Sequence, residues 1–248
     1  MIYTIISILY LLLFAILSLI MYPLCWIVRK CNQKRGDYMA LHYVQWGLRS
    51  VRHTTGLKLS VHGLSNIPKD KAVLFVGNHR SIFDTVVSYG LLPRLTGYIG
   101  KEELSHIPVV SPWMRKLYCL FLPRDDLKKS LEIILTAADQ LKNGISMTIF
   151  PEGTRNKTED YLLPFKAGAF KPAERARVPV VPMVFSYDGP VLEQSFPHLK
   201  KVRVVFSVGE PVETASYTRD DWKALPETLS ERMEALLREQ RKELFGKE

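Results

Sequence analysis

The chain of 248 residues has little cysteine, and its few cysteines form no recognisable site. Cys25, Cys31 and Cys119 are odd in number and lack C-x-x-C spacing. This usage is typical of reduced thiols in a cytoplasmic compartment, and it argues against a disulfide scaffold or a structural zinc site. The histidines other than His79 are scattered, so the sequence predicts no metal site and no cofactor.

Charged side chains are absent from residues 2–28. A basic cluster follows this apolar run: Arg29, Lys30, Lys34 and Arg35. A helix over residues 2–21, rising about 1.5 Å per residue, would cover the roughly 30 Å of a hydrocarbon core. Positive charge before the run and a small-residue cleavage site are both missing, which argues against a signal peptide. The basic side should face the cytoplasm, which predicts a protein of the inner (cytoplasmic) membrane. Pro23 would bend or end the helix, and its length leaves open whether it spans the bilayer or embeds in one leaflet.

The next stretch, residues 37–56, has the periodicity of an amphipathic helix. Its apolar positions recur at helical spacing: Leu41, Val44, Leu48 and Val51. Interspersed aromatic and basic residues favour a helix at the membrane interface, and the alternative is a helix that packs its apolar face on the soluble domain. In both cases the sequence predicts a membrane-attachment module over residues 1–60 and a second domain over residues 61–248.

Negative charge is outweighed by positive charge, and the net charge is +9. A basic chain suits a polyanionic partner such as nucleic acid, an anionic bilayer surface or a phosphorylated substrate. The apolar N-terminal segment favours a membrane surface and a phosphorylated substrate, and it argues against nucleic acid.

Apolar runs alternate with helical patterns after residue 70, without internal repeats. We expect strands near residues 72–78, 96–100, 118–123, 146–150, 178–188 and 201–211, and helices near 81–92, 126–142 and 218–248, the last interrupted at Pro226. This alternation predicts an α/β fold with a mostly parallel β-sheet flanked by helices.

The stretch VGNHRSIFD, residues 76–84, places polar residues where a strand ends, and ligands gather at such carboxyl ends in parallel sheets. Ser81 and Asp84 form an S-x-x-D pattern, which is typical of a helix N-terminal capping box. On one continuous helix His79 and Asp84 would lie about 140° apart. With His79 in the turn before the helix they can meet, and Asp84 would then accept the Nδ1 proton and leave Nε2 to act as a base. This stretch alone leaves both interpretations open.

A second polar loop, FPEGTR at residues 150–155, follows another expected strand. Its backbone N–H groups and the forked guanidinium of Arg155 suit phosphate oxygens. Further basic residues come at strand ends or near a helix start: Lys101, Arg124 and Lys166. The sequence contains no G-x-S-x-G motif, and no serine or cysteine nucleophile is evident beside His79.

Four blocks, NHRSIFD, the arginine that ends YCLFLPR, FPEGTR and VPVVPM, occur in the order of the signature of the glycerolipid acyltransferase family. The chain resembles this family over about residues 60–210, and most of all its bacterial 1-acylglycerol-3-phosphate acyltransferases. The first and third blocks together are very specific to the family.

The resemblance implies that His79 is a general base oriented by Asp84. It further implies substrate-binding residues around the phosphate, namely Lys101, Arg124, Glu152, Gly153, Thr154 and Arg155, with Glu152 positioning the substrate or supporting the loop. Pro182 would shape the acyl or backbone region of the site.

The implied reaction transfers an acyl chain from acyl-CoA or acyl carrier protein to the 2-hydroxyl of a lysophosphatidate at an anionic membrane surface, with the active site on the cytoplasmic face. Glycerol 3-phosphate or another lysophospholipid stays open as the acceptor. Two other classes also stay open: a membrane-bound thioesterase that uses the His–Asp pair on water, and a non-catalytic lipid-binding protein.

Overall fold

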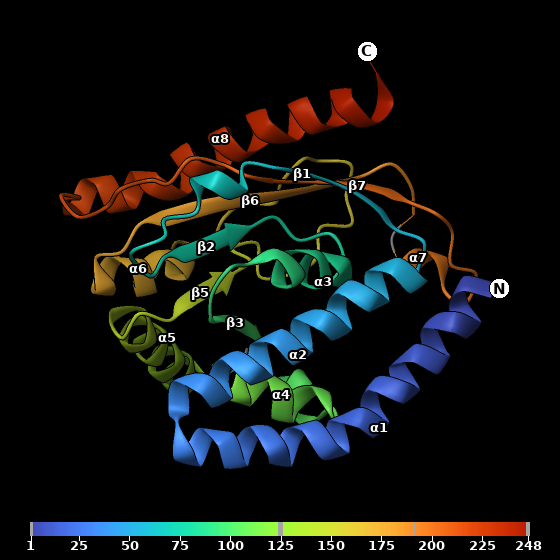
Figure 1. The fold of residues 1–248 in the computed structure, drawn as a ribbon. Helices are drawn as coiled ribbons and strands as arrows, with labels where there is room; N and C mark the ends of the chain where they lie inside the picture. The colour runs from blue at the N-terminus through green and yellow to red at the C-terminus, as the bar shows by residue number, and fades with distance from the viewer. Residues whose placement is uncertain (1, 124–125, 191, 247–248) are drawn as a thin grey trace.

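A mixed β-sheet forms the centre of the computed structural model, which describes residues 2–123, 126–190 and 192–246 (Figure 1). Within these ranges the strands are β1 (Lys58–His62), β2 (Leu74–Gly77), β3 (Thr96–Lys101), β4 (Leu120–Leu122), β5 (Ser146–Ile149), β6 (Val180–Tyr187) and β7 (Arg203–Val208). Their order in the sheet is β1-β7-β6-β2-β5-β3-β4, and of the pairs described only β6 with β7 is antiparallel. The predicted α/β fold with a mostly parallel sheet is confirmed.

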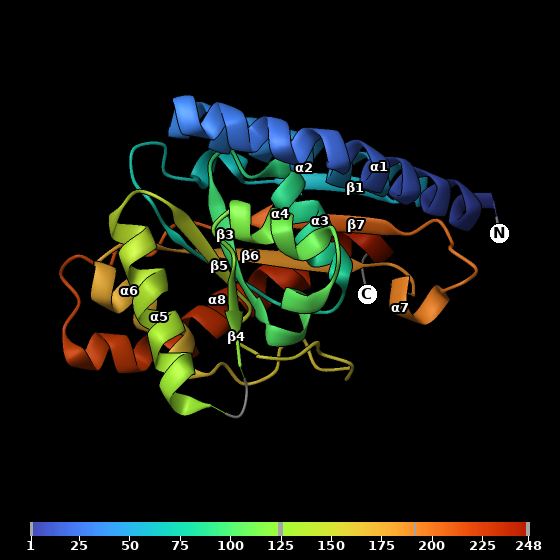
Figure 2. The same cartoon turned by 90° about the horizontal axis from the view of Figure 1, so that it is seen from below.

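Helices cover both faces of the sheet (Figures 1 and 2). They are α1 (Ile2–Cys31), α2 (Gln33–Thr54), α3 (Ile82–Leu91), α4 (Val110–Lys116), α5 (Leu127–Lys142), α6 (Lys171–Ala176), α7 (Leu192–Ser195) and α8 (Arg219–Phe245), with short 3₁₀ turns at Leu64–Asn66, Glu102–His106 and Ala167–Phe170. One hydrophobic core joins α2, α3 and α4 to the sheet, and a second joins α5, α6 and α8 to its other face.

Alternation along the central strands creates these two cores. In β2, Phe75 belongs to the core beneath α2 and α3, whereas Leu74 belongs to the core beneath α8. In β6, Phe185 and Val184 divide in the same way. Both faces of these strands are covered, which explains why their sequences read as continuous apolar runs.

The N-terminal helices form a hairpin in which α1 lies along α2 and α2 lies against the domain (Figures 1 and 2). Leu41 is buried, and Val44, Leu48 and Val51 are half-buried against the first core. The apolar face of α2 therefore packs on the domain, which is the alternative that the sequence left open. In contrast, α1 leaves most of its large apolar side chains exposed, and it is long and apolar enough to cross a membrane. This exposed apolar helix indicates membrane association.

A buried polar contact fastens the hairpin to the sheet. Asp37 of α2 is buried and pairs with Arg29 of α1, with 2.8 Å between Oδ1 and Nε. The hydroxyl of Tyr118, just before β4, donates to the other oxygen of the same carboxylate.

Two local expectations need correction. No strand was expected before residue 72, whereas β1 pairs with β7 through residues such as Leu59 and Val61. The expected interruption at Pro226 is absent, because α8 is continuous through it. Of the two outcomes expected at Pro23, a bend or an end, α1 does not end there: it continues to Cys31 and changes direction along its length (Figure 1).

Close contact between α1 and α2 depends on Gly36, where a Cβ would lie 2.5 Å from the Cα of Arg29. Gly36→Ala must push the two helices apart, and we expect a loss of about 1–3 kcal/mol in the free energy of unfolding. Gly90→Ala is the matched control, because its Cβ would meet only the Arg49 side chain at 3.4 Å. Thermal unfolding in detergent micelles should show a lower Tm for Gly36→Ala alone, and equal Tm values would contradict the close packing.

Candidate active site

The turn after β2 is held from both sides by the loop that follows the neighbouring strand β5. The backbone N–H of His79 donates to Glu152 Oε1 at 2.7 Å, and its carbonyl accepts from the Asn156 N–H at 2.6 Å. Just before it, the side chain of Asn78 makes two hydrogen bonds to the backbone of Phe185 in β6, at 2.8 and 3.1 Å. The backbone at His79 is therefore fixed independently of its imidazole.

The imidazole of His79 meets the carboxylate of Asp84, with 2.9 Å between Nδ1 and Oδ2. Ser81 is the N-cap of α3, and the side chains of Ser81 and Asp84 complete a capping box. The predicted contact and the alternative capping role thus occur together, because the cap is what brings the first turn of α3 back to His79. The catalytic role of the pair stays a prediction.

The carboxylate of Asp84 is completely buried and receives several donors. Besides the imidazole, Oδ2 accepts from the backbone N–H groups of Arg80 at 2.7 Å and Ser81 at 2.8 Å. The other oxygen, Oδ1, accepts from the hydroxyl of Tyr187. A buried carboxylate needs such donors, because an unpaired charge is costly to bury.

The imidazole of His79 is packed on one face and partly exposed. Its ring stacks on Phe150, with 4.2 Å between ring centroids and 15° between planes, and the side chain is 20% exposed. Within the described ranges, Nε2 has no hydrogen-bond partner. This nitrogen is therefore placed to take a proton from a bound hydroxyl or water.

The side chain of Glu152 accepts hydrogen bonds from two backbone N–H groups. It is buried, and its Oε2 accepts from the Leu163 N–H at 2.9 Å while Oε1 holds His79. Burial raises the pKa of Glu152, and the two backbone hydrogen bonds oppose that rise. Of its two predicted roles, loop support matches these contacts.

Gly153 and Lys166 lie together beside this loop. Gly153 has φ +69°, and a Cβ there would lie 2.7 Å from Lys166 Nζ. Any larger residue would be strained and would displace the lysine. The ammonium group thus lies against exposed backbone of the FPEGTR loop, an arrangement that suits an anion.

The remaining predicted residues are less closely grouped. Thr154 is exposed and Arg155 is half-buried, directly before the Asn156 amide that holds His79. Lys101 is exposed at the end of β3. Because β5 separates β3 from β2, Lys101 lies about 10 Å from the turn of His79 across the sheet. Arg124 lies outside the described residues.

Two contacts at the site were not predicted from the sequence. The guanidinium of Arg80 donates to the carbonyls of Thr158 and Asp160, and so ties the NHRSIFD turn to the loop after FPEGTR. The arginine is visible in the motif, but its partners are not. No local sequence pattern predicts the contact between the Tyr187 hydroxyl and Asp84, since the two residues are 103 positions apart.

Comparison with known proteins shows to which family this chain is similar. The model of the family described as Acyltransferase matches residues 58–186. The chain is 30% identical over 186 residues to human 1-acyl-sn-glycerol-3-phosphate acyltransferase beta, covering 75% of this chain and 66% of that protein. It is 31% identical over 179 residues to the enzyme of that name, without the suffix, from Haemophilus influenzae, covering 70% and 73%. The chain thus spans about two thirds of the length of the human relative.

A solved structure shares the fold. The crystal structure of the 1-acyl-sn-glycerophosphate (LPA) acyltransferase PlsC from Thermotoga maritima superposes with a TM-score of 0.80 at 23% identity, covering 96% of this chain and 95% of that one. This likeness includes the sheet and the N-terminal helices, because it extends over nearly the whole chain.

The raised pKa of Glu152 predicts a specific pH dependence of stability. Between its ordinary value of 4.5 and the raised value, the folded protein binds this proton more tightly than the unfolded chain does. The stability that Glu152 contributes should therefore fall as the pH rises through that window. Measured against Glu152→Gln, which does not titrate, the free energy of unfolding of the unaltered protein should decrease with pH. Glu159→Gln, in the exposed part of the same loop, should show no such difference, and a flat difference for Glu152→Gln would contradict the assignment.

Proposed function

The chain belongs to the acyltransferase family, and on that premise we propose that it transfers an acyl chain to the free 2-hydroxyl of a 1-acylglycerol 3-phosphate and so makes phosphatidic acid. The observation that carries the proposal is the His79–Asp84 contact, with Nδ1 held at 2.9 Å on a side chain that is 20% exposed. The names of the human, yeast and Haemophilus relatives support the same acceptor.

The chemistry requires one base and two bound substrates. Neutral His79 takes the proton of the acceptor hydroxyl at Nε2 while the hydroxyl oxygen attacks the carbonyl carbon of a thioester. A carbon–oxygen bond forms, the carbon–sulfur bond breaks, and the proton passes from the imidazolium to the departing thiolate. Asp84 stabilises the positive charge that His79 carries in between. Acyl-CoA or acyl carrier protein would supply the thioester, and both fit this scheme.

Binding of the acceptor phosphate falls to the loop beside the imidazole. Arg155 and Lys166 supply positive charge within one loop, beside the exposed backbone at Gly153. Lys101 at the end of β3 would extend this basic surface, and Arg124 is proposed as a further phosphate-binding residue. Glu152 would keep the loop in place.

Membrane attachment would bring the enzyme to its substrate, since lysophosphatidate lies in the bilayer. The apolar side chains exposed on α1 support insertion, and the packing of α1 along α2 supports a helix that embeds in one leaflet. The basic residues at the end of α1 and the start of α2 favour the cytoplasmic face of the inner membrane. In this scheme residues 1–60 attach to the membrane and residues 61–248 form the catalytic domain.

The test is an acyl-transfer assay with His79→Ala. Purified protein, a labelled acyl-CoA or acyl carrier protein, and a panel of lysophosphatidate, glycerol 3-phosphate and other lysophospholipids are combined, and products are identified by mass. Loss of general base catalysis should lower kcat by about 100-fold or more. The variant should still fold and bind vesicles.

Other outcomes separate the alternatives. Normal turnover by His79→Ala would refute the mechanism. Release of free fatty acid at a rate that lysophosphatidate does not change would point to a thioesterase instead.

Arg155→Ala tests the phosphate assignment. Loss of charge-assisted hydrogen bonds should raise KM for the phosphorylated acceptor by roughly 10-fold to 100-fold and affect a phosphate-free acceptor little. Lys157→Ala, exposed two positions further along the same loop, is the control and should leave KM unchanged. Equal slowing of both acceptors by Arg155→Ala would show that the assigned role is wrong.

A further inference from the structure

We propose that Tyr187, the last residue of β6, is a positioning residue for the His79–Asp84 pair. Its hydroxyl holds one oxygen of the Asp84 carboxylate so that the other oxygen stays on the imidazole Nδ1. The inference rests on the proposed function, and it adds a residue from outside the sequence blocks that suggested that function.

The distribution of donors over the carboxylate carries the argument. All three N–H donors act on Oδ2, and they come from His79, Arg80 and Ser81, next to the helix start. Oδ1 has a donor of a different origin, the hydroxyl of Tyr187 on the sheet. The local contacts restrain the carboxylate at Oδ2 only. The tyrosine adds a second restraint at Oδ1, which further opposes rotation about the Cβ–Cγ bond.

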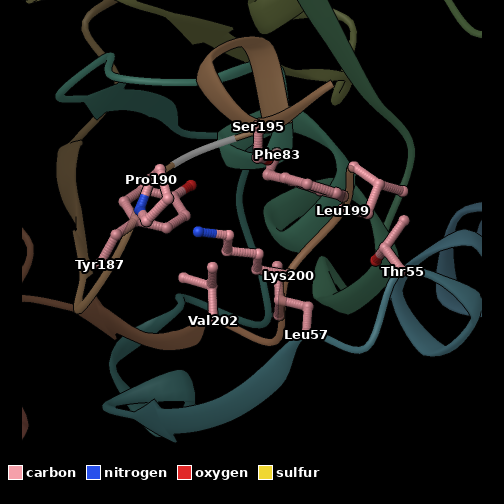
Figure 3. Close-up of a pocket in the computed structure, with 9 residues that line it drawn as sticks. All are labelled: Thr55, Leu57, Phe83, Tyr187, Pro190, Ser195, Leu199, Lys200 and Val202. Carbon is pink, nitrogen blue, oxygen red and sulfur yellow. The ribbon is translucent and has the colours of Figure 1, made fainter. Parts of the chain in front are cut away.

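The surroundings of Tyr187 allow its hydroxyl to be removed without collapse of the site. The residue lines a small pocket together with Phe83, Pro190 and Lys200 (Figure 3). Tyr187 itself connects this pocket to the buried carboxylate, because its hydroxyl contacts Asp84. A phenylalanine at position 187 fits the same space, because only one oxygen is lost.

Charged and titratable groups approach the pair from each neighbouring element. Lys200 extends its amine toward Tyr187 across the pocket (Figure 3). Tyr98 of β3 lies beneath α3 with its hydroxyl 2.9 Å from Ser88 Oγ, and burial raises the pKa of Tyr98. Glu152 and Arg80 lie on the other side, at the backbone of the His79 turn. All of these groups stay in place when the hydroxyl of Tyr187 is removed.

Loss of the hydroxyl has two consequences with a defined direction. The Asp84 carboxylate is less well oriented, so the imidazole is aimed less accurately and kcat falls. The carboxylate also loses a donor that shares its negative charge, so it holds the protonated imidazole more strongly. Higher pH is then needed to free the base.

Tyr187→Phe tests this inference. We expect kcat to fall by roughly 10-fold to 100-fold, the range for losing a hydrogen bond to a charged group, with KM for both substrates unchanged. The acid limb of the kcat/KM profile should move to higher pH. Tyr43→Phe is the control, because it removes a hydroxyl that binds Ser18 and the Phe14 carbonyl far from the pair. It should leave kcat and the pH profile unchanged.

A double-mutant cycle separates positioning from a general structural effect. If Tyr187 acts through the carboxylate, Tyr187→Phe should have no further effect on kcat in an Asp84→Asn background. An equal effect in both backgrounds, or a Tyr187→Phe enzyme with unaltered kcat and pH profile, would overturn the proposal.

A measurement without substrate keeps the two proposals distinguishable. The NMR titration of the His79 imidazole should have a higher midpoint in Tyr187→Phe than in the unaltered protein, whatever reaction the protein catalyses. Failure of the acyl-transfer assay with a shifted midpoint would count against the proposed function alone. A normal assay with an unshifted midpoint would count against the role of Tyr187 alone.

Discussion

One buried carboxylate organises the site, and the elements around it are arranged to supply its donors. Asp84 is inaccessible to water, so each of its oxygens needs a partner from the protein. The start of α3 supplies two backbone N–H groups, the turn after β2 supplies the imidazole, and the end of β6 supplies a hydroxyl. A helix, a turn and a strand are thereby fixed relative to one another. This arrangement sets the orientation of the His79 imidazole.

Helix capping and the proposed base catalysis use the same geometry here. A capping box needs its acidic residue folded back over the helix start, and this is also the position from which a carboxylate can reach a residue in the preceding turn. Glu152 and Asn156 hold the backbone of His79 on both sides, so the turn keeps its shape without help from the imidazole. The structure therefore explains how the His79 imidazole can be partly exposed and still have a fixed orientation.

Local sequence patterns account for most of the fold and the site that could be predicted. The apolar runs predicted the central strands, and the rule that parallel strands carry ligands at their carboxyl ends grouped His79 with Glu152. The Tyr187 contact could not be predicted, because it joins residues 103 positions apart and no periodicity encodes it. β1 was not predicted, because its short alternating sequence directly follows an amphipathic helix. α8 continues through Pro226 because burial of Leu225, Leu229 and other apolar residues on one side outweighs the hydrogen bond that proline removes.

The membrane helix and the site are joined through one intermediate element. Gln45 of α2 is buried and donates to the carbonyls of Tyr89 and Leu92 at the C-terminal end of α3, at 3.1 and 2.7 Å. Arg49 donates to the Gly90 carbonyl there at 2.7 Å. A helix as short as α3 leaves many backbone groups unpaired, and α2 satisfies several of them at the end opposite Asp84. Because α1 packs along α2 and α2 caps α3, the direction in which the imidazole faces is set relative to the apolar surface of α1. The proposed reaction, whose acceptor lies in the bilayer, requires that relation to be fixed.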